Sequence, residues 1–235
     1  MNILAVDTSA NTATVAILKD DRLLAEEIVN HKKTQSETLL PMIDMALKRC
    51  DMDISDIDLF AVANGPGSFT GLRIGVSTIK GLAHGLSKPV VEVSTLEGMA
   101  YNLFMADGII SPIMDARRSQ VYNGVYQWED GVLKELTSPR ALSIEECTED
   151  LLRYNKKVIF LGDGVPVHRE YIKSVMGDRA VFAPANCNDQ QASSLGSLAL
   201  TKEEKKPAHE VTPVYLRKPQ AERELEEKLK GECVK

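Results

Sequence analysis

The chain is poor in cysteine and in aromatic residues, and it has no long apolar run. Its four cysteines lie far apart without a C-x-x-C pair, a pattern that favours reduced thiols over a disulfide framework or a zinc site. The first apolar stretch ends at Asp7, too early for a signal peptide, and no later run approaches the length of a membrane span. We therefore expect a cytoplasmic protein that does not enter the membrane.

Positive charge is also scarce. The chain has 28 Lys and Arg against 34 Asp and Glu, a formal net charge of −6. Proteins that bind nucleic acids on their own usually have a basic face, so the composition argues against strong independent nucleic-acid binding. The 4 histidines form no H-E-x-x-H motif and no pair at ligand spacing, which argues against a histidine metal site. A length of 235 residues allows one large domain or two lobes of about 100 residues.

The most informative segment present is the glycine-rich motif of residues 64–73, NGPGSFTGLR. It follows an apolar run (57–63), expected to be a buried strand, and precedes a helical stretch that reaches about His84. Such a turn can present backbone N–H groups to an anion at a helix N-terminus. Alternatively, its glycines only allow a tight turn and close packing. It is not a P-loop, because Arg73 and Ile74 stand where Gly-Lys-Ser/Thr would be needed.

The N-terminal segment predicts a second part of the same site. Residues 3–9 read as a buried strand that ends in Asp7-Thr8-Ser9, and two further β-prone runs (12–18 and 23–29) complete a three-stranded meander. Asp7 could hold a metal ion or its waters, and the two hydroxyls could donate to phosphate oxygens. The alternative is that these side chains satisfy backbone groups of the turn. The candidate nucleotide loop consists of Asp7, Thr8, Ser9, Gly65, Gly67 and Ser68.

The order of elements in the first hundred residues recurs in the second half. A strand over 109–115 ends in Asp115 as the first ends in Asp7, and β-rich runs follow over 120–128 and 132–136. Ser143 and Glu146 form a capping box that opens a helix over 143–153. A strand over 157–161 then runs into a glycine turn at 162–164. Two βββαβα lobes are typical of the actin-like ATPase (ASKHA) fold, an α/β architecture.

We expect the first lobe, with the glycine loop and the dimerisation surface, to span residues 1–106. The second lobe should span 107–220, and a charged helical tail should follow over 221–235. After about Val181 little chain remains, apart from a helix over 190–204 and an extended segment over 213–219. A reduced second lobe leaves little material for an adenosine pocket. We therefore expect no cofactor, and weak or absent nucleotide binding.

Two helices of the first lobe suggest a surface for a partner. In the helix over 35–50, Met42 and Met45 fall outside an apolar stripe of Leu39, Leu40, Ile43, Ala46, Leu47 and Cys50. Methionine adapts well to a partner surface, although both could also pack under a neighbouring loop. In the helix over 71–86 one side is mostly small, which permits close approach of another element. The candidate interface comprises Thr38, Met42, Met45, Arg49, Arg73, Ile74, Ser77, Thr78 and Gly81.

Taken together, Asp7-Thr8-Ser9, the motif at 65–73 and the segment PVYLR at 213–217 resemble the bacterial TsaB (YeaZ) family over nearly the whole chain. The resemblance implies a non-catalytic paralogue of TsaD, the catalytic subunit of tRNA threonylcarbamoyladenosine synthesis. It also implies pairing through the first-lobe helices, with TsaD or as a homodimer, in a system that includes the ATPase TsaE. That system modifies the adenosine beside the anticodon.

One stretch separates this chain from TsaD itself. The TsaD pattern Val-Asn-His-Leu-Glu-Gly-His carries two histidine metal ligands, and the aligned residues 93–99 here are VSTLEGM. Thr95 and Met99 occupy the two ligand positions, and a hydroxyl and a thioether are poor replacements for imidazole on a divalent ion. The resemblance thus implies neither TsaD chemistry nor a metal site. The alternatives are an ATP-binding kinase or ATPase of the actin-like superfamily and a glycoprotease-type peptidase, the latter disfavoured by the missing histidines.

Overall fold

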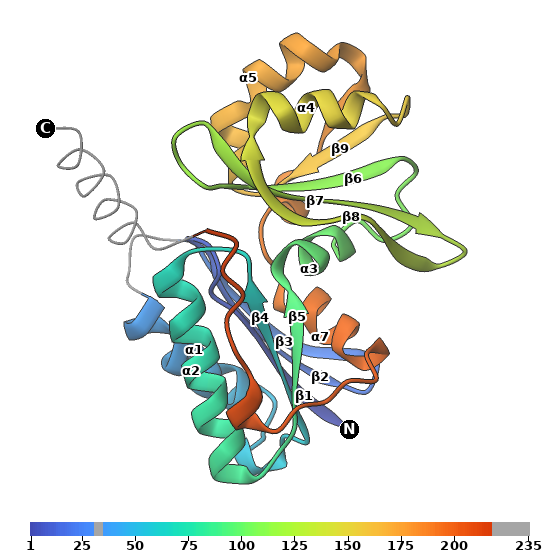
Figure 1. Cartoon of the computed structure of the whole chain (residues 1–235). Helices are drawn as coiled ribbons and strands as arrows, with labels where there is room; N and C mark the ends of the chain where they lie inside the picture. The colour runs from blue at the N-terminus through green and yellow to red at the C-terminus, as the bar shows by residue number, and fades with distance from the viewer. Residues whose placement is uncertain (31–34, 218–235) are drawn as a thin grey trace, which may run out of the picture.

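The computed structural model describes residues 1–30 and 35–217, which form two lobes, each built on a five-stranded sheet (Figure 1). The strand orders are β3-β2-β1-β4-β5 and β10-β9-β6-β7-β8. Read from its other end, the second sheet repeats the first, with its first three strands antiparallel and the later two added in parallel. The internal repeat and the α/β actin-like ATPase fold are therefore confirmed.

The first lobe is a sheet covered on both faces. Its elements are β1 (Asn2–Asp7), β2 (Ala13–Lys19), β3 (Arg22–Val29), α1 (Gln35–Arg49), β4 (Leu59–Gly65), α2 (Phe69–Leu86) and β5 (Val90–Ser94). β1 is buried along nearly its whole length, with Leu4 and Val6 facing the core under α1 and α2, and Ile3 and Ala5 facing the other side. Strands with two covered faces read as continuous apolar runs, which is why this strand is evident in the sequence.

The second face of that sheet is covered by a helix from the end of the chain. α7 (Ala192–Thr201) packs Leu195 and Leu198 in one core with Ile3 and Ala5. Residues 202–217, here called the C-terminal strap, continue along the same lobe, where Lys206 bridges to Val90. The expected second lobe, 107–220, was therefore wrong for its last part. The apolar outer face of β1 needs a cover, and α7 supplies it.

The second lobe contains β6 (Ile109–Asp115), β7 (Gln120–Glu129), β8 (Val132–Ser143), α4 (Ile144–Leu152), β9 (Val158–Leu161), α5 (Gly164–Met176), β10 (Ala180–Phe182) and the short α6 (Ala185–Asn188). Its predicted capping box is present: the Glu146 amide donates to Ser143 Oγ at 3.1 Å, and the Ser143 amide donates to Glu146 Oε2 at 3.0 Å. β8 continues beyond the predicted 136 because it pairs with β7 up to Ser143. α3 (Thr95–Tyr101) connects the lobes.

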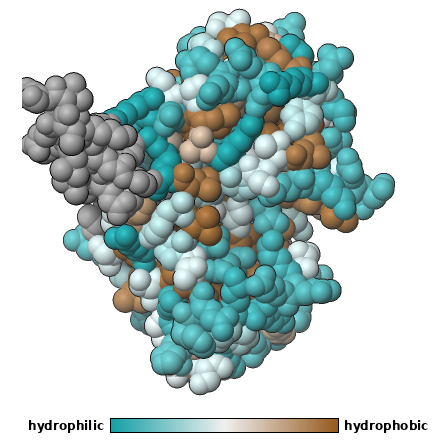
Figure 2. Space-filling view, in the orientation of Figure 1, coloured by the Kyte–Doolittle hydropathy of each residue, from teal (hydrophilic) through white to brown (hydrophobic). Residues whose placement is uncertain are grey.

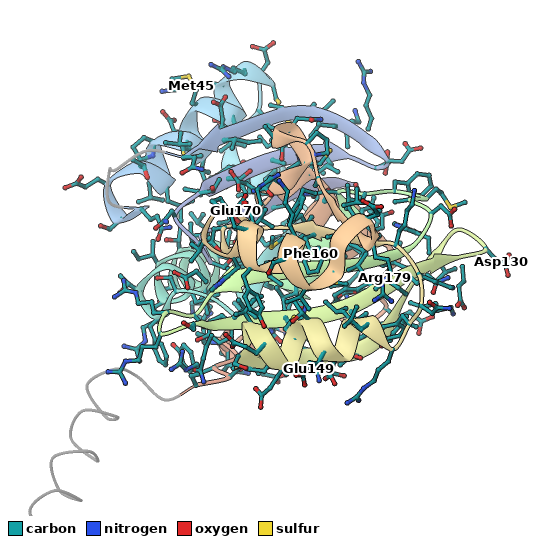
Figure 3. All side chains as sticks on the ribbon, turned by 90° about the horizontal axis from the view of Figure 1, so that it is seen from above. Met45, Asp130, Glu149, Phe160, Glu170 and Arg179 are labelled. Atoms are coloured by element: carbon teal, nitrogen blue, oxygen red, sulfur yellow. The ribbon has the colours of Figure 1, made fainter. Side chains whose placement is uncertain are left out.

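The core face of α1 differs from the predicted one at two positions. Met42 is buried, with 7% of its surface exposed, whereas Leu40 is 56% exposed. The buried residues of this helix follow the spacing i, i+3, i+4, i+7, i+8 from Leu39, the usual stripe of a helix that covers a sheet. Placing Met42 on the partner surface was therefore wrong, as was placing Leu40 in the core. Met45 lies off the core, at the rim of the molecule (Figure 3).

The predicted tail, 221–235, lies outside the described residues. Across residues 1–30 and 35–217, no helix is both long enough and apolar enough to span a bilayer. Figure 2 shows a mostly hydrophilic face on the first lobe, with apolar residues visible mainly near the junction of the lobes and on the second lobe.

Candidate functional site

A cleft of about 510 Å³ opens where the two lobes meet. The first lobe contributes residues that follow β1 and the N-terminal turn of α2, and the second contributes the end of β6 and the turn before α5. The lining residues are Ser9, Ala10, Asn11, Gly67, Ser68, Phe69, Thr70, Arg73, Met114, Asp115, Ala116, Arg117, Tyr122, Asp163 and Arg217. Of the predicted nucleotide loop, only Ser9, Gly67 and Ser68 line this cleft.

The glycines of the motif pack against the turn after β1. A Cβ added at Gly67 would lie well under 3.0 Å from the Ser9 carbonyl oxygen, and one at Gly71 would meet the Thr8 carbonyl oxygen in the same way. The Ser68 amide donates to the Ser9 carbonyl at 2.6 Å. The alternative of close packing, weighed from the sequence, therefore accounts for these glycines, and the two segments form one rigid unit.

Asp7 and Thr8 are used inside that unit. The Asp7 side chain is only 2% exposed, and its Oδ1 accepts from the Ser9 amide at 2.8 Å. Burial raises the pKa of this carboxyl from 3.8 to about 6, although the Ser9 hydroxyl and amide hold the pKa down in part. Thr8 Oγ1 donates to the Gly71 carbonyl at 2.7 Å. Both side chains thus satisfy the turn, and the expected metal role of Asp7 does not fit a carboxyl enclosed in this way.

The strap joins the motif from the other side. The Val214 amide donates to the Asn64 carbonyl at 2.7 Å. Gly65 has φ of +127°, and a Cβ there would also clash with the Val214 carbonyl oxygen, so this position requires glycine. Arg217 donates to the Ala116 carbonyl of the second lobe. The motif at 65–73 and the segment at 213–217 are far apart in the sequence, but they are hydrogen-bonded and packed together in the structure.

The second lobe places two carboxyl groups in the cleft that were not chosen from the sequence. Asp115 ends β6 as Asp7 ends β1, and Asp163 precedes α5. Burial, together with the nearby Asp115 and Asp189, raises the pKa of Asp163 to about 6, while a hydrogen bond from the Asp115 amide opposes the rise. The correspondence of Asp115 with Asp7 in the repeat was the signal that could have identified this wall.

The positions that hold the histidine ligands in the TsaD pattern are buried here. Thr95 and Met99 are 0% and 1% exposed, on the helix between the lobes. Met99 packs with Leu96, Ile110 and Leu161, and its sulfur accepts from Gln190 Nε2 at 3.6 Å. In the described part of the chain, no three His, Cys, Asp or Glu side chains lie close enough to hold a metal ion.

The predicted partner residues do not all share one face. Arg49 pairs with Glu27 on β3, so the side of α1 that bears Arg49 and Met45, four residues apart, is turned to the sheet edge rather than to α2. Leu40 is exposed on the opposite side. On α2, Arg73, Ser77 and Gly81 are exposed, while Ile74 and Thr78, like Thr38 on α1, are half-buried. No atom lies within 4 Å of a Cβ added at Gly81.

Comparisons with known proteins place the chain in a family. The model described as TsaD, tRNA N6-adenosine threonylcarbamoyltransferase, matches residues 22–225. The chain is 39% identical over 222 residues to the "tRNA threonylcarbamoyladenosine biosynthesis protein TsaB" of Bacillus subtilis, covering 94% of this chain and 96% of that one. It is 32% identical over 192 residues to the protein of the same name in Escherichia coli, covering 79% and 82%.

Comparison with solved structures supports the same family assignment. A solved structure of YeaZ from Pseudomonas aeruginosa matches with a TM-score of 0.74 and 27% identity, covering 92% of this chain and 99% of that one. A second structure, described as similar to peptidase YeaZ from the same organism, has a TM-score of 0.79, 29% identity and the same coverage. Component A of the Acidaminococcus fermentans (R)-2-hydroxyglutaryl-CoA dehydratase, 12% identical with a TM-score of 0.52 over 86% and 98% of the two chains, shares the fold alone. The chain belongs to the TsaB (YeaZ) family of tRNA threonylcarbamoyladenosine biosynthesis proteins.

Proposed function

We propose that this chain is a non-catalytic subunit in the biosynthesis of threonylcarbamoyladenosine in tRNA, and that it acts in the cytoplasm by binding and supporting TsaD, with the ATPase TsaE as a further partner. The names of its relatives support the pathway. The burial of Thr95 and Met99 in the contact between the lobes supports the non-catalytic role. A packed thioether and hydroxyl leave neither imidazole ligands nor space for an ion at these positions.

The partner surface is proposed on α1 and α2, because these helices cover the sheet on one side and keep exposed apolar and small residues on the other. Leu40 is the exposed apolar residue on the flank of α1 away from β3. Ser77 and Gly81 are exposed on α2, and their small size would let a partner helix approach closely. A specific interface usually buries about 1,200–2,000 Å² in total, which two helices from each partner can supply. The same surface would serve a homodimer when TsaD is absent.

Reconstituted transfer tests this function. Threonylcarbamoyl adenylate and substrate tRNA are incubated with this chain, with the TsaD and TsaE of the same organism, and with mixtures that omit one protein at a time. We expect modified adenosine only when TsaD is present, and more of it when this chain is added. Transfer by this chain in the absence of TsaD would contradict the proposal, as would a TsaD reaction that is indifferent to this chain.

The alternative of an ATP-binding kinase or ATPase rests on the cleft, which lies between the lobes of an actin-like fold. Titration of the isolated chain with ATP and Mg²⁺ separates the two readings. The proposed function predicts weak or no binding and no hydrolysis, whereas a kinase or ATPase requires saturable binding. Against the peptidase alternative, no three His, Cys, Asp or Glu side chains in the described part of the chain lie close enough together to hold the metal ion of a metallopeptidase.

A further inference from the structure

One flank of α5, in the second lobe, exposes a row of apolar side chains. Val167, Tyr171 and Val175 follow one another at intervals of four residues, so they lie on the same side of the helix, with 61%, 36% and 37% of their surfaces exposed. No other helix within residues 1–30 and 35–217 exposes more than two large apolar residues. Figure 2 shows apolar surface at the top of the second lobe, where α5 lies in Figure 1. Apolar residues exposed singly are normal, whereas a contiguous row of this kind marks an interaction site.

The row faces α4 rather than the edge of the sheet. On the opposite flank of α5, the guanidinium carbon of Arg169 lies 4.2 Å from the centroid of the Phe182 ring, and the ammonium nitrogen of Lys173 lies 6.0 Å from it. Phe182 belongs to β10, the edge strand of the second sheet. α4 and α5 pack side by side over this sheet and share one core. The apolar row therefore borders a surface that both helices form.

Carboxylates accompany the row. Glu145 and Glu149 are exposed on α4, four residues apart, and Glu149 and Glu170 lie at opposite margins of the two helices (Figure 3). In the described part of the chain, the carboxylates of Glu145 and Glu149 have no hydrogen-bond or ion-pair partner, because the ion pairs of α4 use Asp150. Glu170 is paired only with Lys173, at 3.8 Å. The surface, here called the α4–α5 face, consists of Glu145, Glu149, Val167, Tyr171 and Val175.

We propose that the α4–α5 face binds a basic amphipathic helix of a partner protein, with apolar side chains of that helix on the row of α5 and its Lys or Arg side chains at Glu145 and Glu149. An amphipathic helix presents apolar anchors every three or four residues, so one that lies along α5 contacts the whole row. Charge selects this class of partner, because unpaired carboxylates attract a basic segment and repel a polyanion such as tRNA.

This inference goes beyond the proposed function and does not depend on it. The surface proposed for TsaD lies on α1 and α2 of the first lobe, whereas the α4–α5 face belongs to the second lobe (Figure 1). The chain can therefore hold TsaD and a second protein at the same time.

The test is fluorescence anisotropy of the full chain with a labelled synthetic helical peptide that has one row of leucines flanked by lysines. A second peptide keeps the leucines and replaces every lysine with glutamate. A single helix buries less area than a standard interface of about 1,200–2,000 Å², so we expect a Kd of about 100 μM or tighter for the lysine peptide. The glutamate peptide should bind at least about tenfold more weakly.

Variants of the chain locate the binding. Val167→Asp makes the chain more acidic but places a carboxylate in the apolar row, so it should weaken binding of the lysine peptide at least about tenfold. Val132→Asp makes the same change at an exposed valine of β8 and should leave binding unchanged. Glu145→Gln combined with Glu149→Gln should weaken binding about threefold, and less at high salt. Glu129→Gln, at an exposed carboxylate of β7, is the matched control.

The inference is overturned if the lysine peptide shows no saturable binding, if the two peptides bind equally, or if Val167→Asp binds as tightly as the natural chain. Loss of peptide binding when TsaD is added at saturation would also overturn it, because the face would then belong to TsaD. Light scattering covers a second copy of the chain: a homodimer that Val167→Asp dissociates would make that copy the occupant. Should Val167→Asp fail to fold by circular dichroism, Tyr171→Ala takes its place.

Discussion

The rings of Phe69 and Tyr215 stack with their centroids 4.1 Å apart and their planes 7° apart. Arg73 Nε donates to the Tyr215 hydroxyl at 3.0 Å, and its guanidinium carbon lies 5.5 and 5.7 Å from the two ring centroids. Phe69 opens α2 at the cleft, whereas Tyr215 belongs to the strap. The contact therefore fixes the end of the described chain to the helix that lines the cleft.

Removing this stack should loosen the strap. Tyr215→Ala should lower the free energy of unfolding by about 1–3 kcal/mol, because an aromatic pair contributes about 0.5–1.5 kcal/mol beyond the area that it buries. Tyr215→Phe keeps the stack and loses only the hydrogen bond from Arg73, so it should cost less than about 1 kcal/mol. Urea unfolding measures both. A loss in Tyr215→Phe equal to that in Tyr215→Ala would assign the stability to the hydrogen bond.

Substitutions at three positions of α1 test which side chains belong to the core and which to the proposed partner surface. Met42→Glu should unfold the chain, because it places a carboxylate in the core beside Ile43 and Ala46. Leu40→Glu should leave the fold intact and weaken both the homodimer and TsaD binding at least about tenfold. Met45→Glu, on the flank toward β3, should fold and have a smaller effect.

Circular dichroism and light scattering, with TsaD pull-down, distinguish these outcomes. The sequence analysis included Met45 in the candidate interface. Because Arg49 pairs with Glu27 on β3 and Leu40 is exposed, we expect the centre of that interface to lie nearer Leu40. Strong loss of binding in Met45→Glu with normal binding in Leu40→Glu would restore the original assignment.

The fold could be predicted from the sequence because its strands are either continuously apolar, as residues 3–6 are, or bounded by turn residues. The repeat strengthened the fold prediction, because the same order of elements occurs twice and each lobe has an acid at the end of its first strand. The position of α7 could not be predicted, because its apolar residues fit either sheet. Only the uncovered face of β1, with Ile3 and Ala5, determines which sheet α7 covers.

The site was harder to predict because it is formed by residues that are far apart in the sequence. The glycine motif was evident, yet whether Gly67 and Gly71 serve an anion or the turn after β1 depends on Thr8 and Ser9, some sixty positions away. The wall formed by Asp115 and Asp163 joins the end of β6 to the turn before α5, and only the correspondence of the two lobes points to it in the sequence. On α1, the helical wheel predicted the core stripe except at two positions, because it placed Leu40 in the core and Met42 outside it.

The glycines of α2 provide a matched pair. Gly71→Ala should destabilise the chain by about 3 kcal/mol or prevent folding, since the added methyl group would overlap the Thr8 carbonyl oxygen. Gly81→Ala meets no atom within 4 Å and should stabilise the helix by about 0.5–1 kcal/mol. If a partner helix packs closely at Gly81, the same substitution should weaken TsaD binding. A destabilised Gly81→Ala monomer would show that this face is not open.

Asp7 should make stability depend on pH in an unusual direction. Its pKa is about 6 in the folded chain against an ordinary 3.8, so between these values the native state binds more protons than the unfolded state. The free energy of unfolding therefore falls as pH rises from about 4 to 6. The loss from this group reaches about 3 kcal/mol and does not grow further above pH 6.

Asp7→Asn removes the charge and keeps an oxygen that can accept from the Ser9 amide. It should be more stable than the natural chain by about 2–3 kcal/mol near pH 7.5 and equal to it near pH 4. Urea unfolding at both pH values, compared with Asp21→Asn at an exposed position, isolates this carboxyl, because Asp163 and all other groups contribute equally to both chains. A variant that is less stable than the natural chain near pH 7.5 would mean that the ionised carboxylate, rather than its neutral form, is what the turn after β1 requires.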